Sequence, residues 1–575
     1  MNDAPDLIIR GGTIVDGSGQ PEFRGDIGIK GDRIVAVGDV PANGCEETDA
    51  TGLWVTPGFV DIHTHYDGHI TWATHLEPSS SHGVTTVVTG NCGVGFAPCR
   101  PEDRDRLIGL MEGVEDIPGP VLATGLPWKW ESFPEYLDFL DNRSFDMDVA
   151  VQIPHAPVRV FVMGDRGAAG APATPSEIAQ MREIVRNAVQ AGALGFSTSR
   201  SINHRASDGS PTPSLKATED ELTGISLGLT DADQGVVQLI SDFDDPEPEF
   251  AMLRRIARQS RRPMSMSLMQ LPHAPRRWRT LLDKIIQANA DGLDIKAQVC
   301  GRPVGTIAGL DLSFNPFSFC PSYQAIASQP LEERVAALAT PEMREKILGE
   351  FPGKSDMPIA PFITNFANIF PMGAIPDYEP SRTDSIAARA ERQGMNPAAL
   401  AYDLMLREDG RAMFYLPAMN YADGNMDAAE AMLRDPHTIL GLGDGGAHCG
   451  IICDASFTTH MLIRWASVLG LPAVVKALTA DTAGAVGLGD RGQLRPGYRA
   501  DINLIDPGNL FLHKPEMVDD LPEQGSRLHQ RADGYVATIV GGQVTRWHGE
   551  RTGALPGRLV RGARTAPAAE LSPAI

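Results

Sequence analysis

The sequence is short of cysteine, of positive charge and of long apolar runs, and each shortage excludes a class of protein. The seven cysteines, an odd number scattered over 575 residues, predict no disulfide framework and fit a reducing cytoplasm. No apolar run approaches the length of a membrane span. The 50 Lys and Arg residues against 73 Asp and Glu leave a net charge of -23, which opposes binding to nucleic acid or to an anionic membrane.

The first residues of the sequence give no indication of targeting. Residues 1 to 6 lack the basic and apolar regions of a targeting segment, so we expect a cytoplasmic protein. A chain of this length is long enough to bury a large core beside a smaller domain. We expect its partner to be a small-molecule substrate, and we leave open whether it forms a homo-oligomer.

Both ends of the chain are rich in short strands and glycine-containing turns. Residues 7–55 alternate short apolar segments with polar turns, a pattern that is typical of small antiparallel units. Residues 481–550 have the same style, so we predict that 1–56 and 481–550 form one small β-sandwich. Residues 551–575, rich in Ala, Pro and Arg, are predicted to form a flexible tail.

Between these ends, apolar strands alternate with helical stretches, which predicts parallel βα units. Two of the helices begin with capping boxes, Thr174 to Glu177 and Thr218 to Glu221. Eight strands are predicted, the number that a (β/α)8 barrel needs, so we expect an α/β fold with a TIM-like barrel over residues 57–480. The predicted strands are Val55–Val60, Thr85–Thr89, Val149–Ile153, Gly192–Ser197, Val236–Ile240, Pro263–Leu268, Ile295–Val299 and Ile439–Leu442.

The seventh and eighth predicted strands are separated by about 140 residues, more than a βα unit uses. The stretch contains segments rich in Phe and Pro, and Asn396–Pro397 is a good start for a helix. We predict an inserted subdomain over about residues 303–435. It is either a lid that shapes the substrate pocket or a structural insertion.

The strongest functional signal is the pair His63 and His65, which follows an apolar run from Leu53 to Val60. Side chains two residues apart in an extended segment point the same way, so both imidazoles can reach one cation beyond the carboxyl end of the strand. The active sites of barrels lie at that end, and Asp61 can orient one of the rings. We therefore predict that His63 and His65 bind a metal ion.

Two further side chains at strand ends match metal chemistry. Cys92 lies in a glycine-flanked loop after the second strand, where it is either a small buried residue or a thiolate ligand that faces the histidines. Asp444 follows the eighth strand among glycines, where it either forms a turn or binds the metal and accepts a proton from its water. We predict one metal site made of His63, His65, Cys92 and Asp444, in which Asp444 is catalytic.

Polar side chains that follow the third, fourth and eighth strands are candidates for contacting the substrate. A hydrogen-bonded structural role is the alternative for each histidine among them. The candidates are His155, Arg200, His204 and His448.

Several segments together resemble the amidohydrolase superfamily, most closely its N-acyl-D-amino-acid deacylase branch. They are Pro57–His65, Gly83–Gly93 with its Asn-Cys-Gly motif, Gly192–Thr198 and Gly489–Asp506. The resemblance covers nearly the whole chain and implies a metal-dependent barrel, with a β-sandwich from both chain ends, that hydrolyses amide bonds. It also implies that His63, His65 and Asp444 bind one metal. Cys92 matches the bridging or second-metal thiolate, and Asp444 also matches the general base.

The chain departs from this family at the second metal. The family has a histidine near the end of strand five and another at the end of strand six, and Leu239 and Leu268 align there. Leucine cannot bind zinc, so we expect one zinc ion per chain. The family's carboxylate-binding positions read Gln270 and Arg302 here. Arg302 is either a bidentate clamp for a substrate carboxylate or a structural side chain.

These signals predict a zinc-dependent amidohydrolase in which metal-bound hydroxide attacks an amide carbonyl and Asp444 is the general base. One alternative is hydrolysis of another acyl-type bond, in a cyclic amide, a carbamate or an ester, because the carboxylate-binding residues differ. A second alternative is a non-catalytic scaffold that has kept the barrel, since a fold alone does not secure a function.

Overall fold

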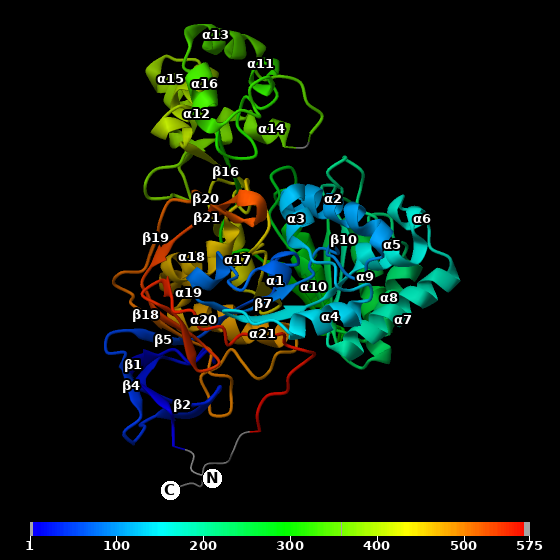
Figure 1. Cartoon of the computed structure of the whole chain (residues 1–575), viewed down its shortest axis with the longest axis vertical. Coiled ribbons are helices and arrows are strands. Elements are labelled where there is room, and N and C mark those ends of the chain that lie inside the picture. Colours follow the sequence, from blue (N-terminus) through cyan, green and yellow to red (C-terminus); the bar gives the residue numbers. More distant parts are fainter. Residues whose placement is uncertain (1–3, 358, 569–575) are drawn as a thin grey trace.

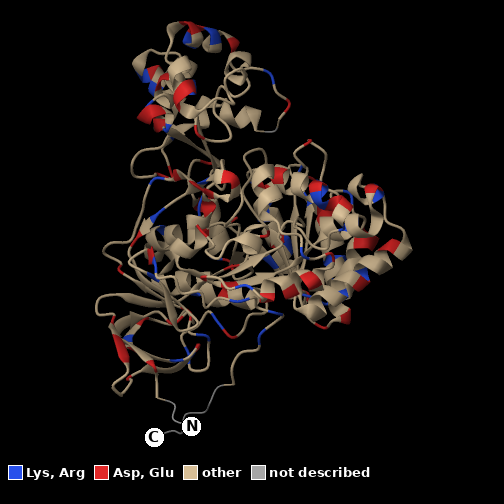
Figure 2. Cartoon of the chain, in the orientation of Figure 1, with Lys and Arg blue, Asp and Glu red and all other residues tan. Residues whose placement is uncertain are grey.

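The computed structural model describes residues 4–357 and 359–568. Figure 1 shows a large body of strands and helices, with a strand-rich unit below it and a helical lobe above it. Residues of both charge signs are spread over the helices of the body and of the lobe (Figure 2). Within the described residues, no helix combines the length and the apolar composition that crossing a bilayer requires.

The body is built on parallel strands that neighbour one another in the order of the chain. Three of them form one sheet and six form another. The strands are β6 (Phe59–Asp61), β7 (Val84–Thr89), β8 (Asp148–Val151), β9 (Ile153–Pro154), β10 (Gly195–Arg200), β11 (Val236–Ser241), β12 (Met264–Ser267), β13 (Ile295–Val299) and β17 (Thr438–Leu440). Because β8 and β9 lie on one segment interrupted at Gln152, each of the eight predicted strand segments is present.

The first and the eighth strand segments approach each other just beyond their carboxyl ends. The backbone N of Asp444 donates a hydrogen bond to the carbonyl of His63 (3.0 Å), and the backbone N of His65 donates to the carbonyl of Gly445 (2.8 Å). Thr64 and Gly445 form a parallel bridge. In the described part of the chain the two sheets are not one continuous ladder, but these bonds bring the predicted metal ligands of both segments together.

Helices cover the body, and two of them begin at the predicted residues. The Thr174 hydroxyl accepts a bond from the backbone of Glu177, and the Glu177 carboxylate accepts one from the backbone of Thr174, a full capping box. Thr218 caps its helix, but the Glu221 side chain turns to buried partners instead. The main helices are α2 (Arg104–Glu115), α4 (Phe133–Asp141), α5 (His155–Met163), α7 (Pro175–Ala191), α8 (Glu219–Asp231), α9 (Pro246–Ser260), α10 (Arg277–Ala290), α17 (Asp427–Leu433) and α20 (Leu471–Lys476).

Both ends of the chain meet in one nine-stranded sheet. Its strand β5 (Trp54–Pro57) joins the two ends, because it pairs with β1 (Leu7–Ile14) on one side and with β18 (Ile502–Ile505) on the other. The remaining strands are β2 (Phe23–Lys30), β3 (Arg33–Gly38), β4 (Glu46–Asp49), β23 (Tyr535–Val540), β24 (Gln543–Trp547) and β25 (Glu550–Arg551). The two ends share this sheet, whereas a sandwich arrangement and the domain bounds stay predictions.

The first predicted strand is divided between these two parts of the molecule. Residues Trp54–Pro57 belong to the nine-stranded sheet, and Phe59–Asp61 belong to the body. Gly58 lies between them, at a point where a Cβ atom would be 2.2 Å from the Oγ1 atom of Thr85. Glycine is therefore required where the chain passes the second body strand and changes sheet.

A separate lobe lies between the seventh and eighth body strands, drawn at the top of Figure 1. Its three strands are antiparallel: β14 (Val304–Gly309), β15 (Phe370–Pro371) and β16 (Met413–Met419). Phe317, Tyr402 and Phe414 belong to an apolar core apart from that of the body. The helices of the lobe are α11 (Pro321–Gln324), α12 (Leu331–Leu338), α13 (Pro341–Glu350), α14 (Ala360–Ile363), α15 (Ile386–Gln393) and α16 (Pro397–Met405). The lobe lies where the insertion was predicted, and its role as an independent subdomain or as a lid stays a prediction.

The segment predicted as a flexible tail is packed against the body over its described part, which corrects that prediction. The backbone N of Val149 in β8 donates to the carbonyl of Arg558 (3.0 Å), and that of Val560 donates to the carbonyl of Val149 (2.7 Å). Leu559 and Val560 are buried. The segment is rich in Ala, Pro and Arg, a composition that predicts a flexible tail, and it contains few apolar residues such as Leu559 and Val560. Residues 569–575 lie outside the described part.

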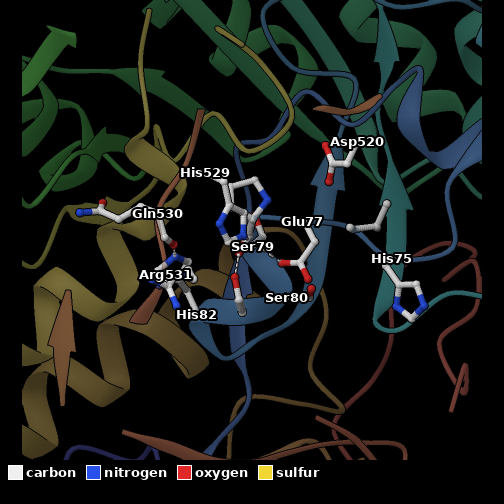
Figure 3. A network of polar contacts seen from close by, with 12 residues as sticks. His75, Glu77, Ser79, Ser80, His82, Asp520, His529, Gln530 and Arg531 are labelled. Carbon is white, nitrogen blue, oxygen red and sulfur yellow. Dashed lines mark hydrogen bonds and ion pairs between the residues drawn. The ribbon is translucent and has the colours of Figure 1, made fainter. Parts of the chain in front are cut away.

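A buried carboxylate ties the body to the nine-stranded sheet. Glu77 forms ion pairs with Arg546 of β24 and with Arg551 of β25, the latter at 3.0 Å. Figure 3 shows Glu77 close to Ser80 and His529, and His529 Nε2 lies 3.8 Å from Glu77 Oε2. Because a buried charge without partners is costly, these contacts hold the segment that follows His63 and His65 against the carboxyl-terminal strands.

Candidate metal centre

Three buried side chains from the first two body strands can reach a single cation. One ligand atom each from His63, His65 and Cys92 lies within 4.8 Å of the other two. The His63 Nε2 atom is 3.3 Å from the Cys92 sulfur. The two histidines follow β6 and the cysteine follows β7, so neighbouring parallel strands deliver all three side chains to the same end of the body, as the sequence predicts.

Asp444 completes this cluster from the eighth strand segment. Its Oδ1 atom lies 3.5 Å from His63 Nε2 and 3.8 Å from His65 Nε2. The Asp444 side chain is 17% exposed, whereas the two histidine side chains are almost fully buried. The carboxylate therefore stands between the buried imidazoles and the solvent-accessible side of the centre, which is where a substrate would approach.

The loops that carry these side chains hold several non-glycine residues in the left-handed backbone region. Cys92, Leu442, Asp444 and His448 have φ angles of 54°, 60°, 47° and 54°. Such backbone angles are uncommon for residues with a Cβ atom and cost free energy unless the surrounding contacts hold them. Their concentration in the two loops of this cluster is typical of functional sites.

Each histidine is oriented by a contact on its Nδ1 atom. His63 Nδ1 lies 2.6 Å from Gln298 Oε1, and Gln298 in turn donates to Ser265 Oγ (3.0 Å). His65 Nδ1 lies 3.3 Å from Glu115 Oε1. The hydrogen bond on His63 Nδ1 fixes the tautomer and the orientation of that ring, whereas His65 Nδ1 approaches Glu115 without forming a hydrogen bond. Both Nε2 atoms face Asp444.

Sequence reasoning missed the two residues that orient the histidines. Glu115 is the last residue of α2 and is buried together with the apolar face Leu107, Met111 and Val114. In the sequence, the signal for Glu115 was a carboxylate on an otherwise apolar helix face. Gln298 lies in β13 between apolar neighbours, and the signal there was a polar residue in a strand that is otherwise buried.

Burial is the largest cause of the pKa shifts of His63, His65 and Asp444. It lowers the pKa of His63 to about 4, and burial, with His63, His448 and His204 nearby, lowers the pKa of His65 well below its ordinary value. Burial raises the pKa of Asp444 to about 6. The imidazoles are therefore neutral at pH 7, the form in which histidine binds a metal.

Burial and the carboxylates of Glu115 and Asp444 raise the pKa of Cys92 well above the ordinary value of a thiol. A cation in the cluster would offset this cost, because metal binding favours the deprotonated ligand. Two neutral imidazoles, a thiol and a carboxylate are a donor set that suits a divalent metal, and zinc in particular. The residues present thus fit the metal that the sequence predicts.

The two leucines aligned with the family's second-metal histidines are buried and offer no atom that could bind a metal. Leu239 and Leu268 are each 1% exposed and belong to the apolar core of the body. The neighbouring Gln238 faces the centre instead, since its Oε1 atom accepts a bond from the backbone N of Cys92 (3.1 Å). A leucine side chain has no donor atom, so neither residue can act as a metal ligand beside Cys92.

The structure brings two of the predicted substrate-contacting residues to the centre. His448 Nε2 lies 3.7 Å from Glu115 Oε2, and His204 Nδ1 lies 2.9 Å from Ser199 Oγ. Both histidines are close enough to lower the pKa of His65. Their contact with a substrate stays a prediction.

The other three predicted substrate contacts are engaged with the protein itself. His155 is fully buried, with its ring nitrogens on Thr198 (2.8 Å) and Glu221 (3.0 Å). Arg200 pairs with Glu249 (2.7 Å). Arg302 is buried in an ion pair with Asp454, donates to Ser456 (2.9 Å) and lies over the Tyr378 ring. All three side chains are thus occupied by partners within the protein, and their substrate roles stay predictions.

Two hollows show on which side ligands can approach. A small crevice borders Asp444 and is lined also by Asp454, Arg527 and Leu528. A cavity of about 660 Å³ lies at the amino ends of β11, β12 and β13, where Val236, Met264 and Lys296 line it. Neither His63, His65, Cys92 nor Asp444 lines that cavity. The four clustered side chains therefore lie at the carboxyl ends of the strands, away from this cavity and beside the crevice at Asp444.

Comparisons with known proteins agree with this geometry. A family model for amidohydrolases matches residues 46–546. A D-aminoacylase from Alcaligenes xylosoxydans xylosoxydans is 28% identical over 520 residues, which cover 88% of this chain and 89% of the relative. An N-acyl-D-aspartate deacylase from the same organism is 29% identical over 572 residues, covering 97% and 96%.

Solved structures show the same fold. A D-aminoacylase crystal structure, described as defining a novel subset of amidohydrolases, is 25% identical, has a TM-score of 0.63, and covers 97% of this chain and 99% of its own. An N-acyl-D-glutamate deacylase from Bordetella bronchiseptica, complexed with zinc and a phosphonate inhibitor, has a TM-score of 0.64 at 23% identity, covering 97% of this chain and 100% of its own.

Proposed function

This chain belongs to the amidohydrolase family, and from that premise we propose that it is a metal-dependent hydrolase of amide bonds with one zinc ion per chain. The observation that carries the proposal is the convergence of His63, His65, Cys92 and Asp444 at the ends of three strand segments. The D-aminoacylase and N-acyl-D-aspartate deacylase relatives support an N-acyl-D-amino acid as the substrate.

In the proposed mechanism, the residues of the centre have different roles. A bound zinc ion would polarise the amide carbonyl and lower the pKa of water from about 15.7 towards about 7. Asp444, whose carboxylate faces both Nε2 atoms, accepts the proton of the attacking water and delivers it to the leaving nitrogen. His63 and His65 would hold the ion, and their burial keeps bulk water from weakening the electrostatic contacts.

A second candidate function follows from how the predicted carboxylate-binding residues are engaged. Arg302 already pairs with Asp454, and the amide of Gln270 donates to Asp423 (2.7 Å). A substrate carboxylate at Arg302 would have to replace Asp454. This favours, as the alternative, a substrate without a free carboxylate, such as a cyclic amide, a carbamate or an ester, hydrolysed at the same centre.

The first candidate is tested with a matched panel of substrates. We expect the zinc-loaded protein to hydrolyse N-acetyl-D-amino acids at least about 10-fold faster than their L enantiomers, because the two enantiomers place the amide differently relative to Asp444. Amine release is measured for each D and L pair and for D substrates whose carboxylate is blocked as an amide. Equal rates for both enantiomers, or faster cleavage of blocked or cyclic substrates, would favour the second candidate instead.

A further inference from the structure

Glu115 is placed between two histidines of the centre. Its Oε1 atom lies 3.3 Å from His65 Nδ1, and its Oε2 atom lies 3.7 Å from His448 Nε2. The side chain is 2% exposed, and in the described part of the chain neither Oε1 nor His65 Nδ1 has a hydrogen-bond partner, so the 3.3 Å contact between them is a close approach of two otherwise unpaired polar atoms. Burial of a carboxyl group without a partner of opposite charge costs free energy. Among the described residues Glu115 pairs with His65 and His448 and with no Lys or Arg, which points to a role for this side chain.

The backbone around Glu115 also holds the loop that carries Asp444 and His448. The backbone N of His448 donates to the carbonyl of Glu115, and that of Cys449 donates to the carbonyl of Asp116 (3.2 Å). The backbone N of Gly450 donates to the Asp116 carboxylate (2.9 Å). Hydrogen bonds therefore connect the end of α2 to three successive residues of the loop after the eighth strand.

The same turn reaches the base of the helical lobe. Ser313, which follows β14, donates its hydroxyl to the Asp116 carboxylate (3.2 Å), and its backbone N donates to the carbonyl of Gly450 (3.1 Å). Asp116 has a φ angle of 51°, a left-handed conformation that these bonds hold in place. The turn formed by Glu115 and Asp116 thus joins a metal-binding histidine, the Asp444 loop and the lobe.

We propose that Glu115 is a positioning residue of the metal centre, which orients His65 through its carboxylate and fixes the Asp444–His448 loop through its backbone. This inference rests on the proposed function, because it assigns to His65 the role of a metal ligand. A carboxylate on the Nδ1 atom fixes the tautomer that presents Nε2 to the ion and makes the imidazole a stronger donor. Glu115 takes the place beside His65 that Gln298 takes beside His63, with a carboxyl group instead of an amide.

The test is the metal affinity of Glu115→Gln, which keeps the size of the side chain and removes its charge. We expect its affinity for cobalt, measured by competition with a chelator, to fall about 10- to 100-fold, with a changed visible absorption spectrum of the bound cobalt. The matched control is Glu112→Gln in the same helix, where the Oε1 atom accepts a bond from Gly119 (2.9 Å). This control should bind cobalt like the unchanged protein.

The two possible failures are distinguishable. If the unchanged protein binds no cobalt, the proposed function fails. If it binds cobalt and Glu115→Gln has the same affinity and spectrum, the positioning role alone is overturned. Should the Gln variant not fold, Glu115→Asp serves as the second variant. It keeps the charge but withdraws it by one methylene, so weakened cobalt binding supports the role and unchanged binding overturns it.

Discussion

Asp444→Asn should lower kcat by about 10²- to 10⁴-fold, the range that a positioned general base contributes. The amide has the same shape as the carboxylate but cannot take a proton from the attacking water at neutral pH. The other three ligand groups still lie within 4.8 Å of one another, so we expect the variant to fold and to bind one metal ion when zinc is supplied in excess. The measurement is kcat together with metal content on the same preparation.

The control for this variant lies on the same strand segment. Asp435 precedes β17, at the end opposite to Asp444, and accepts bonds from the backbone and ring of His437. Asp435→Asn keeps an acceptor oxygen there and should leave kcat unchanged. A near-native rate for Asp444→Asn with full metal content would show that another group takes the proton.

His63→Ala should abolish metal binding at micromolar zinc and all turnover with it. His63 is a predicted ligand whose Nε2 atom faces both Cys92 (3.3 Å) and Asp444 (3.5 Å). Loss of a direct ligand should exceed the roughly 10- to 100-fold loss of metal affinity that removal of an orienting partner causes. Bound zinc per chain after equilibrium dialysis is the readout.

His69→Ala is the control for the loss of a buried imidazole. His69 follows in the same segment, is buried, packs against Tyr66 and Trp72 and is not one of the three grouped ligands. Its removal should destabilise the protein while the folded fraction still binds one metal ion. If both variants lost zinc equally, the loss would reflect packing, and the assignment of His63 as a ligand would be contradicted.

The convergence of the centre could be predicted because it depends on rules that are local to each strand. An apolar run followed by polar residues marks the carboxyl end of a buried strand, and parallel strands gather those ends on one side. His63, His65, Cys92 and Asp444 each follow such a run, and the structure places them together. These four residues could be predicted without knowing where the helices or the lobe lie.

Features that depend on register or on distant packing could not be predicted. The fourth strand was predicted from Gly192, but that residue, with a φ of 124°, ends helix α7, and the strand is Gly195–Arg200. The contact between Gln238 and the backbone N of Cys92 depends on strand register, because a shift of one residue reverses the face of a side chain. Glu115 meets His65 only through the placement of α2.

The most direct test of the account is the metal content of protein purified without added metal, determined by elemental analysis and expressed as ions per chain. The account predicts one zinc ion per chain, removed by a chelator together with activity and restored with it. Two ions per chain would contradict the single centre and require ligands other than Leu239 and Leu268 for the second. No bound metal, even after zinc is supplied, would contradict the metal centre itself and favour a non-catalytic scaffold.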